Sequence, residues 1–368
     1  MKAMAAVPGK HEPVWVNIPE PGAPGPGWIR CRTARLGVSD LDRQWLAAGG
    51  LTPPAGESFV ILGHQVLAWV DDVGPGVDGF MVGDSVVPLP RHTVATAQVF
   101  PLRADDNSMG RRAGLFHQHG YATEFWLEPA ANLQLVPDYL RDIAILTEPF
   151  ALAETALNEA QQLRDIRLEL YQERDAAIDA ETGGRLLCLG DTLASFAAAG
   201  VGCLQDLEVW LLGLEAPRSP LAKLAGDLGL TYWNASRVPW SEFQKPARGF
   251  DILIETSPDL GVWREAIRTL NQRGVISLAA QLTACAPSSL DGHFLWEVIT
   301  RRNLAVAGSA NAPRDFSATA EVLRQFKLRY PSVWPRLITA EYSLPDALQA
   351  WRPRGSRDLQ TVINFGRV

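Results

Sequence analysis

Three histidines in apolar or aromatic surroundings are the first candidates for chemistry in this sequence. His64 lies inside the run VILGHQVLAWV, whereas His117 and His119 form an H-x-H pair in FHQHGYATEF. An imidazole can carry a proton near neutral pH and is a common metal ligand. A histidine among aliphatic residues is, however, more often a hydrogen-bonded core side chain, and paired histidines are more often surface residues. Both interpretations are open at this point.

His64 belongs to a stretch, Phe59 to Pro90, that the sequence predicts to be β-rich. The runs VILGHQVLAWV and SVVPLP flank a centre with Gly74, Pro75 and Gly76, which predicts strands folded back over tight turns. Before this stretch, PVWVNI and WIRCRTARLGV alternate with turns rich in proline and glycine. Such alternation is typical of antiparallel strands.

From Arg185 onward, short apolar strands alternate with helix-like segments. The strands are RLLCLG, LEVWLLG, TYWN, FDILIE, GVISLAA and LAVAGS, and segments such as LASFAAAGVGCL and SPLAKLAGDLG separate them. This pattern predicts an α/β domain with a doubly wound parallel sheet, the Rossmann fold. Just before it, residues 158–181 combine helical spacing of apolar residues with opposite charges, which predicts a solvated linking helix.

The turn after the first of these strands is a candidate phosphate site. A dinucleotide fingerprint has G-x-G-x-x-G there, whereas this sequence has GDTLAS. Gly190 keeps the tight turn, but Thr192 and Ser195 stand at the second and third glycine positions. A β-branched residue hinders close approach of the pyrophosphate, although hydroxyl groups can still donate to it. We expect Gly190, Thr192 and Leu193 to contact a nucleotide that binds more weakly than at an intact fingerprint.

The segment after the second strand, LLGLEAPRSP, bears on the choice between NAD and NADP. An acidic residue here binds ribose hydroxyls, whereas an arginine accommodates a 2′-phosphate. Gly213 stands at the acidic position. Glu215 is then a candidate for the ribose, and Arg218 with Ser219 is a candidate pair for the phosphate. The sequence leaves this choice open.

Composition argues against several classes of function. The chain of 368 residues is 47% hydrophobic and 20% charged, with a formal net charge of −7. That length suggests two domains, and the negative charge argues against a nucleic-acid partner. No run is suited to a signal peptide or a membrane span, so we expect a cytoplasmic protein without a membrane partner. The four cysteines are scattered without a C-x-x-C pair, which argues against disulfides and a structural zinc knuckle.

Several segments together resemble the medium-chain dehydrogenase/reductase superfamily, the zinc-type alcohol dehydrogenases. LGHQ followed by VGPGVDGFMVGDSVV is similar to its zinc-binding segment, and the final third, from DGHFLWEV to VINF, is similar to the ending of its glucose-dehydrogenase-like branch. The resemblance spans nearly the whole chain. It implies a discontinuous β-rich GroES-like catalytic domain, residues 1–147 and 313–368, and a Rossmann nucleotide-binding domain, residues 148–312. It also implies NADP or NAD as cofactor and a homo-oligomer, either a dimer or a tetramer.

The resemblance places a G-V-C-G-T-D-x-E segment of that branch on LGVSDLDRQ. The zinc-ligand position falls on Ser39 and the proton-relay threonine on Leu41. A serine hydroxyl is a poor zinc ligand, and leucine cannot pass a proton. Asp40 stays open as a hard ligand, a base or a helix cap. Gln65 replaces the usual glutamate beside His64, which removes a negative charge from the surroundings of the metal.

Three further residues take their roles from the resemblance. Glu148 corresponds to an acidic residue near zinc or a substrate hydroxyl, His117 lies in the loop that passes the substrate, and Asn311 corresponds to an asparagine between nicotinamide and sugar. Only His64 and Glu148 are kept as metal ligands, so we expect catalytic zinc to be weak or substoichiometric. The lobe at residues 90–125 contains no cysteine, which implies that structural zinc is absent.

These observations lead to competing hypotheses. The first is an enzyme, an NAD(P)-dependent oxidoreductase that transfers hydride between nicotinamide and an alcohol or carbonyl of a sugar- or polyol-like small molecule. Its catalytic residues would be His64, Asp40, Ser39, Glu148 and His117. The alternative is a dehydrogenase-derived non-redox enzyme or binding protein that has lost zinc and, in one version, the nucleotide. A zinc-free dehydrogenase with an unusual substrate is a third option.

Overall fold

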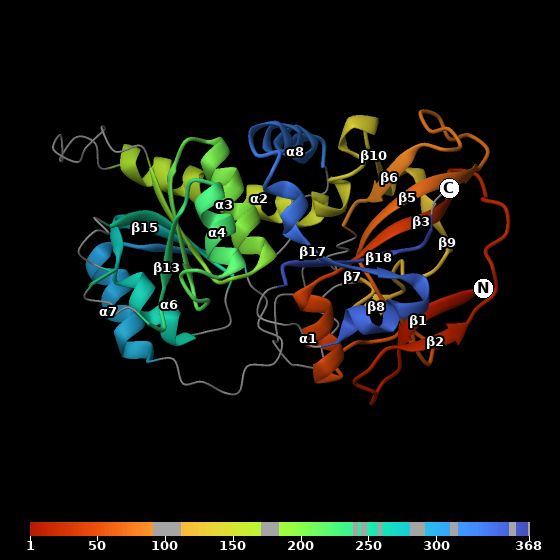
Figure 1. The fold of residues 1–368 in the computed structure, drawn as a ribbon, viewed down its shortest axis with the longest axis horizontal. Helices are drawn as coiled ribbons and strands as arrows, with labels where there is room; N and C mark the ends of the chain where they lie inside the picture. Colours follow the sequence, from red (N-terminus) through yellow and green to blue (C-terminus); the bar gives the residue numbers. More distant parts are fainter. Residues whose placement is uncertain are drawn as a thin grey trace. The chain divides into compact units, whose positions relative to one another are not determined.

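The computed structural model describes residues 1–90, 112–170, 184–237, 242–243, 249–256, 260–279, 291–309, 316–352 and 358–366. The chain divides into two compact units (Figure 1). The first consists of Met1–Thr147, Arg314–Ala320 and Ile338–Val368, and the second of Glu148–Pro313 and Glu321–Leu337. Both units are therefore built from segments that are far apart in the sequence.

One segment of this division differs from the expected domain bounds. Residues 321–337 group with the second unit, whereas the family resemblance implies that residues 313–368 belong together to the first. The difference arises because part of helix α8 (Ser317–Arg329) packs against the second unit. The ring of Phe326, on this helix, lies with its centroid 4.8 Å from that of Phe150 in the second unit.

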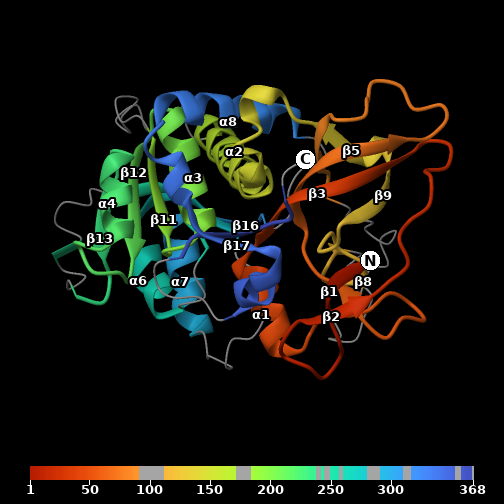
Figure 2. The ribbon, with the colours of Figure 1, turned by 45° about the vertical axis from the view of Figure 1, so that its right-hand side comes forward.

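The first unit is β-rich (Figure 2). A seven-stranded sheet has the order β10-β6-β5-β3-β18-β17 with β9 paired to β3, a three-stranded sheet has the order β2-β1-β4, and β7 pairs with β8. The strands are β1 (Lys2–Ala6), β2 (Val14–Asn17), β3 (Trp28–Val38), β4 (Val60–Ile61), β5 (Gln65–Val73), β6 (Ser85–Pro88), β7 (Arg112–Ala113), β8 (His117–Gln118), β9 (Phe125–Pro129), β10 (Leu133–Leu135), β17 (Ile338–Ser343) and β18 (Gln360–Asn364). The helical elements are α1 (Asp40–Ala48), η2 (Ala130–Asn132), η3 (Asp138–Leu140), η4 (Ala144–Leu146) and η6 (Leu344–Trp351).

Strands β3 and β5 pair antiparallel and position the candidate site. The run VILGHQVLAWV is not one strand, because β4 ends at Ile61 and β5 begins at Gln65. Gly63 adopts a φ of 83°, a conformation that favours glycine, and turns the chain at this point. His64 therefore lies in a bend rather than inside a strand.

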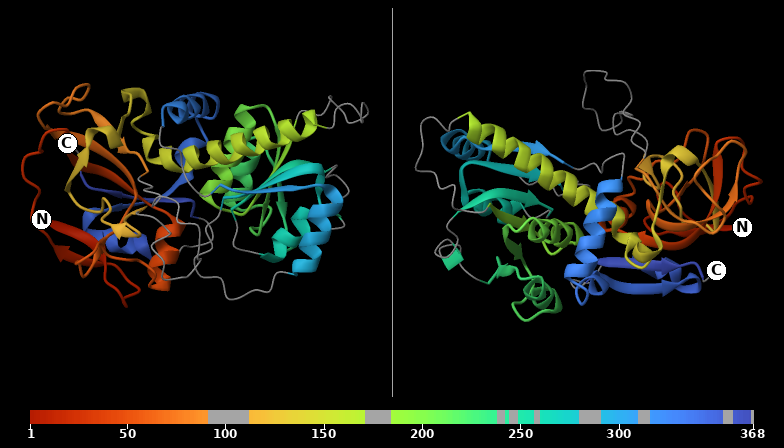
Figure 3. Two further views of the ribbon diagram at one scale, coloured as in Figure 1. Left: turned by 180° about the vertical axis from the view of Figure 1, so that it is seen from behind. Right: turned by 90° about the horizontal axis from the view of Figure 1, so that it is seen from above.

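The second unit contains a six-stranded parallel sheet with the order β13-β12-β11-β14-β15-β16. Helices connect the strands and cover the sheet (Figure 3), which confirms the predicted doubly wound Rossmann fold. Strands β11 and β14 are buried along their whole length, as is usual for the central strands of a parallel sheet. The strands are β11 (Arg185–Leu189), β12 (Glu208–Gly213), β13 (Thr231–Asn234), β14 (Phe250–Glu255), β15 (Leu270–Leu278) and β16 (Ala305–Gly308). The remaining helices are α2 (Thr147–Glu169), α3 (Leu193–Leu204), α4 (Pro220–Asp227), α6 (Leu260–Ile267), α7 (Gly292–Arg302) and η5 (Trp334–Leu337).

The linking helix expected over residues 158–181 begins earlier in the chain. Helix α2 starts at Thr147 and ends at Glu169. Residues 171–181 of the expected helix lie outside the described residues. Within the described part of the chain, no helix is both long enough and apolar enough to cross a membrane.

Candidate functional site

His64 and Asp42 form a buried pair in the first unit. The His64 side chain is 7% exposed, and its Nδ1 atom lies 2.9 Å from Oδ1 of Asp42, whose side chain is 0% exposed. Asp42 lies in the first turn of α1, which follows β3, and His64 lies in the bend before β5. Because β3 and β5 are antiparallel neighbours, the end of one strand and the start of the other bring these side chains together.

Ser39 supports Asp42 from the start of α1. Oδ2 of Asp42 accepts hydrogen bonds from the backbone N of Ser39 at 2.9 Å and from its Oγ at 2.8 Å. The backbone N of Asp42 in turn donates to Ser39 Oγ at 3.2 Å, so the two residues form a capping box. The helix cap is therefore Ser39 rather than Asp40, whose Oδ1 lies 3.4 Å from Nη1 of Arg43 in an ion pair.

The carboxyl group of Asp42 is ionised at neutral pH. Its burial raises the pKa, but the charge and hydrogen bond of His64 and the hydrogen bonds from Ser39 outweigh that effect and hold the pKa below its usual value. An ionised carboxylate only accepts hydrogen bonds, so Nδ1 of His64 carries the proton in this contact. Asp42 thus fixes the orientation of the ring.

Gln65 and Gln360 form a hydrogen bond across strand β3. Oε1 of Gln65 accepts from Nε2 of Gln360 at 2.9 Å, and both side chains are buried. Between them lies Gly37, at which a Cβ atom would be 2.4 Å from Gln360 Nε2 and 2.8 Å from Gln65 Oε1. The absence of a side chain at residue 37 therefore makes the contact possible. Among the described residues, Oε1 of Gln360 is buried without a hydrogen-bond partner.

The described side chains that the first unit places around His64 do not form a zinc ligand set. Ser39 Oγ is neutral and donates to Asp42, the Gln65 amide is neutral and accepts from Gln360, and both oxygens of Asp42 hold other groups. Catalytic zinc needs three protein ligands from Cys, His and carboxylate side chains. No group of three or more such side chains is arranged to hold a metal in the part of the chain that the structure describes.

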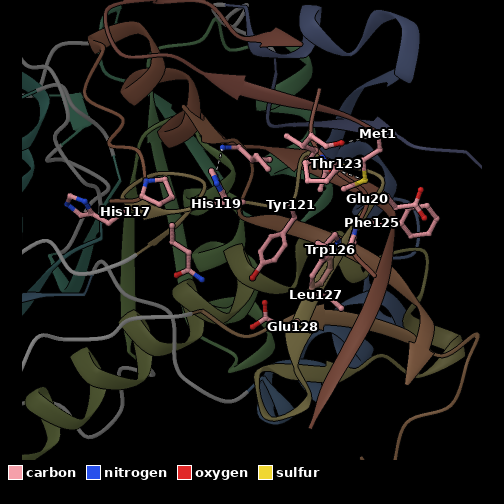
Figure 4. A pocket seen from close by; sticks show the side chains of 17 residues that line it. Met1, Glu20, His117, His119, Tyr121, Thr123, Phe125, Trp126, Leu127 and Glu128 are labelled. Carbon is pink, nitrogen blue, oxygen red and sulfur yellow. Dashed lines mark hydrogen bonds between the residues drawn. The ribbon is translucent and has the colours of Figure 1, made fainter. Parts of the chain in front are cut away.

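His117 and His119 line a pocket of the first unit (Figure 4). The ring of His119 stacks on Phe59, and its Nδ1 accepts a hydrogen bond from the backbone N of Ile61 at 3.1 Å. Burial lowers the pKa of His119 despite the opposing charge of Glu57, so the ring is neutral at neutral pH. His119 is therefore a hydrogen-bonded wall residue, and His117 is its neighbour on the same pocket wall.

This pocket is separate from the His64–Asp42 pair. It has a volume of about 550 Å³ and a wall that combines aromatic residues, including Tyr121, Phe125 and Trp126, with polar ones. Neither His64 nor Asp42 belongs to its described lining. The predicted catalytic residue His117 lines this pocket, and its loop runs beside the chain that leads to His64, since the backbone N of Tyr121 donates to the carbonyl of Gly63 at 2.9 Å.

The remaining catalytic candidate, Glu148, lies in the first turn of α2 and belongs to the second unit. The nucleotide candidate Asn311 lies outside the described residues. Of the predicted catalytic residues, the structure therefore joins Ser39 to His64 through Asp42.

The turn after β11 has the features of a phosphate turn. Gly190 has a φ of 106°, which favours glycine, and α3 begins at Leu193. Thr192 has an extended backbone, so its position does not require glycine, and its Oγ1 caps α3 by accepting from Ser195 N at 3.1 Å. The N–H groups of the first helical turn and the helix dipole favour a phosphate at this place.

The hydroxyl groups that replace the two glycines hold the turn together. Ser195 Oγ donates to the carbonyl of Leu189 at 2.7 Å, and Thr256 Oγ1 donates to the same carbonyl at 2.8 Å. Thr192 Oγ1 lies 2.7 Å from Thr256 Oγ1, so the hydroxyls form one cluster at the ends of β11 and β14. Thr192 and Ser195 thus have structural partners of their own.

The loop after β12 contains the candidates for recognition of the adenosine ribose. Gly213 ends the strand, and the backbone N of Glu215 donates to Oδ2 of Asp191 at 3.1 Å. Arg218 is exposed. Oγ of Ser219 caps α4 by accepting from the backbone N of residue 222 at 3.1 Å, so this hydroxyl serves the helix rather than a phosphate.

Two contacts in these sites differ in how far a local sequence pattern indicates them. The spacing Ser39-x-x-Asp42 before an apolar segment is that of a capping box, so Asp42 has a local signal. Asp191 and Tyr232 interact through a hydrogen bond between residues 41 positions apart, and no local pattern indicates that contact.

Comparisons with known proteins agree with this architecture. Residues 141–365 match the family described as glucose dehydrogenase C-terminus, and residues 25–138 match the alcohol dehydrogenase GroES-like domain. The chain is 28% identical to glucose 1-dehydrogenase 2 of Vulcanisaeta moutnovskia, with 99% of each chain covered, and 24% identical to glucose 1-dehydrogenase of Methanocella arvoryzae, with 100% of each covered. The solved structure of Haloferax mediterranei glucose dehydrogenase in complex with NADP, Zn and gluconolactone has the same fold, with a TM-score of 0.82 at 24% identity and 100% of both chains covered. The chain therefore belongs to the glucose-dehydrogenase-like branch of the medium-chain dehydrogenase/reductase superfamily of oxidoreductases.

Proposed function

We propose that the protein transfers hydride between NAD(P) and a hydroxyl or carbonyl carbon of a sugar- or polyol-like small molecule. Relatives are named glucose dehydrogenases, and one of them is described with NADP, Zn and gluconolactone. The observation that carries the proposal is the buried His64–Asp42 pair. This pair supplies a histidine in a fixed orientation, which general acid–base catalysis requires.

The second unit suits a nicotinamide dinucleotide. Its strand order reverses at β11, which lies between β12 and β14, and ligands of such sheets bind at the carboxyl ends of these strands. The turn at Gly190 and the start of α3 are at that end and suit a pyrophosphate. The Thr192 and Ser195 hydroxyls are turned toward protein partners. We therefore propose that Gly190, Thr192 and Leu193 contact the nucleotide through their backbone rather than through a hydroxyl group.

When bound, the nicotinamide supplies the hydride acceptor or donor. Oxidation of a hydroxyl also releases a proton from its oxygen, and in this proposal Nε2 of His64 takes that proton. The Asp42 carboxylate stabilises the imidazolium that forms, because it is ionised and hydrogen-bonded to Nδ1. Ser39 holds Asp42 in place with its backbone N–H and its hydroxyl. In the reverse direction, His64 returns the proton to the carbonyl oxygen.

One observation favours the alternative, a dehydrogenase-derived protein without redox activity. The Ser39 hydroxyl and the Gln65 amide, at positions where the superfamily binds or surrounds a metal, are occupied by other protein groups. A protein that had lost the reaction would not need these two side chains for a metal, so they could bond to other protein groups. Measured hydride transfer distinguishes the two functions.

The test measures reduction of NAD⁺ and NADP⁺ with a panel of aldoses and polyols, and nucleotide binding separately by calorimetry. We expect His64→Gln to lower kcat by about 10²-fold or more, which is the usual contribution of a general acid–base. His11→Gln is the matched control, because His11 is an exposed histidine of the same unit that hydrogen-bonds a backbone carbonyl. Nucleotide affinity should stay the same in both variants, since the proposed nucleotide contacts belong to the second unit.

Two outcomes would contradict the proposal in different ways. Full turnover in a folded His64→Gln protein would show that His64 is not the acid–base residue. Saturable nucleotide binding without hydride transfer to or from any panel member would favour the non-redox alternative.

A further inference from the structure

The carboxylate of Asp191 occupies the end of strand β12. Asp191 follows Gly190 in the phosphate turn, yet its side chain reaches the loop after the neighbouring strand. Oδ2 accepts hydrogen bonds from the backbone N of Leu214 at 2.6 Å and of Glu215 at 3.1 Å. Oδ1 accepts from the hydroxyl of Tyr232, on β13, at 2.7 Å. Two consecutive backbone N–H groups thus hold an anion that belongs to the protein itself.

Gly213 provides the space for this carboxylate. A Cβ atom at residue 213 would lie 2.1 Å from Asp191 Oδ1 and 2.5 Å from the Tyr232 hydroxyl oxygen. The carboxylate therefore lies where a side chain of residue 213 would begin. In dinucleotide-binding folds, this end of the second strand carries the acidic residue that binds the ribose hydroxyls. Here an acid is present at the same place, but the phosphate turn supplies it.

We propose that Asp191 makes the protein select NAD over NADP. The inference rests on the proposed function, because it concerns the nucleotide of that reaction. The N–H groups of Leu214 and Glu215, which could hold a 2′-phosphate, are bonded to the Asp191 carboxylate. A phosphate placed beside this carboxylate would be repelled, and partial burial strengthens the repulsion because water screens it less. NAD has a neutral hydroxyl at the same carbon of the ribose.

The position of the carboxylate is fixed by its partners. Burial and the charge of Asp191 raise the pKa of Tyr232, so its hydroxyl stays protonated and keeps donating. Asn234 donates from Nδ2 to the carbonyl of Leu214 at 2.9 Å and so holds the same loop. To admit a phosphate at these N–H groups, Asp191 would have to give up its hydrogen bonds to both of them.

Calorimetric titration of the 368-residue chain with NAD⁺ and with NADP⁺ tests the inference. The parent protein should bind NAD⁺ at least about tenfold more tightly than NADP⁺, and Asp191→Asn should reduce this ratio to about threefold or less by tightening NADP⁺ binding. Asparagine keeps the shape of the side chain but removes its charge. Tyr232→Phe is the matched control, because it removes a partner of Asp191 and keeps the charge, so the preference for NAD⁺ should persist. Arg218→Ala removes the exposed cation of the same loop.

Each result has a distinct meaning. Equal binding of both nucleotides, or tighter binding of NADP⁺ to the parent protein, overturns this inference and leaves the proposed function intact. An unchanged ratio in folded Asp191→Asn also overturns it, as does a loss of NADP⁺ affinity alone in Arg218→Ala, since the arginine would then hold the phosphate. If neither nucleotide binds saturably, both the proposed function and this inference fail.

Discussion

Replacement of Asp42 by asparagine should change which nitrogen of His64 carries the proton. Asparagine keeps the shape of the side chain but has one oxygen and one NH₂ group. The backbone N–H of Ser39 requires an acceptor, so the oxygen faces Ser39 and the NH₂ group faces Nδ1 of His64. Nδ1 must then accept a hydrogen bond, and the proton moves to Nε2. The nitrogen that should take a proton from the substrate becomes a donor.

The same contacts set the expected change in stability. In Asp42→Asn, hydrogen bonds to a charged acceptor become neutral ones, which lowers the free energy of unfolding by about 1–2 kcal/mol. Asp42→Ala removes the capping box and leaves buried donors of Ser39 and His64 without acceptors, so we expect a loss of about 3–5 kcal/mol. The folded-state pKa of Asp42 is lowered. Its stabilisation is therefore complete above the unfolded-state pKa of about 4 and is lost as the pH falls through the folded-state value.

Long-range ¹H–¹⁵N spectra of the histidine rings report the protonated nitrogen, and urea unfolding at several pH values reports the free energy. The parent protein should carry the His64 proton on Nδ1 and lose stability at acidic pH, whereas Asp42→Asn should carry it on Nε2 and lack this acid-dependent loss. The exposed ring of His11 is an internal reference. A proton on Nδ1 in folded Asp42→Asn would refute the reasoning, as would an Asp42→Ala protein within about 0.5 kcal/mol of the parent.

Gly37→Ala should lower the free energy of unfolding by about 1–3 kcal/mol, because its Cβ would force Gln360 from a buried position. Gly22→Ala, where the added Cβ meets no atom within 4 Å, is the control, and equal unfolding free energies for the two variants would contradict the role of Gly37. The thiols of Cys31 and Cys188 should resist alkylation at mildly alkaline pH in the native protein and react after denaturation, because burial raises their pKa values. Mass spectrometry measures the extent of alkylation. Rapid alkylation of either thiol in the folded protein would show that this thiol is not buried.

Most of the fold could be predicted because its elements leave local signals in the sequence. Buried parallel strands such as β11 and β14 are short, mostly apolar runs, and segments of helical pattern separate such runs in the sequence. The division of VILGHQVLAWV at Gly63 could not be predicted, because the run has the composition of one strand. Only the backbone conformation of Gly63 turns the chain there and moves His64 into a bend.

The candidate sites were less predictable because their decisive contacts are distant in sequence. Gln65 and Gln360 are 295 positions apart, and their hydrogen bond depends on the strand that separates them. The contact of Asp191 with the loop after β12 spans 23 positions and depends on the pairing of two parallel strands. A local pattern, the capping-box spacing of Ser39 and Asp42, indicates the helix start but not the histidine that Asp42 also holds.

In the proposed mechanism, which uses no zinc, the residues at two positions of the superfamily's metal site have structural roles in the first unit. A buried polar group without a partner costs about 1–3 kcal/mol, so the neutral side chains of Ser39 and Gln65 would destabilise the fold if they had no hydrogen-bond partners. Ser39 instead holds the carboxylate of Asp42 and starts α1, and Gln65 bonds Gln360 in the space that Gly37 leaves. His64 keeps a charged partner through Asp42. Because Ser39 also holds the carboxylate that orients His64, proton transfer by the histidine itself is the chemistry that we propose for this arrangement.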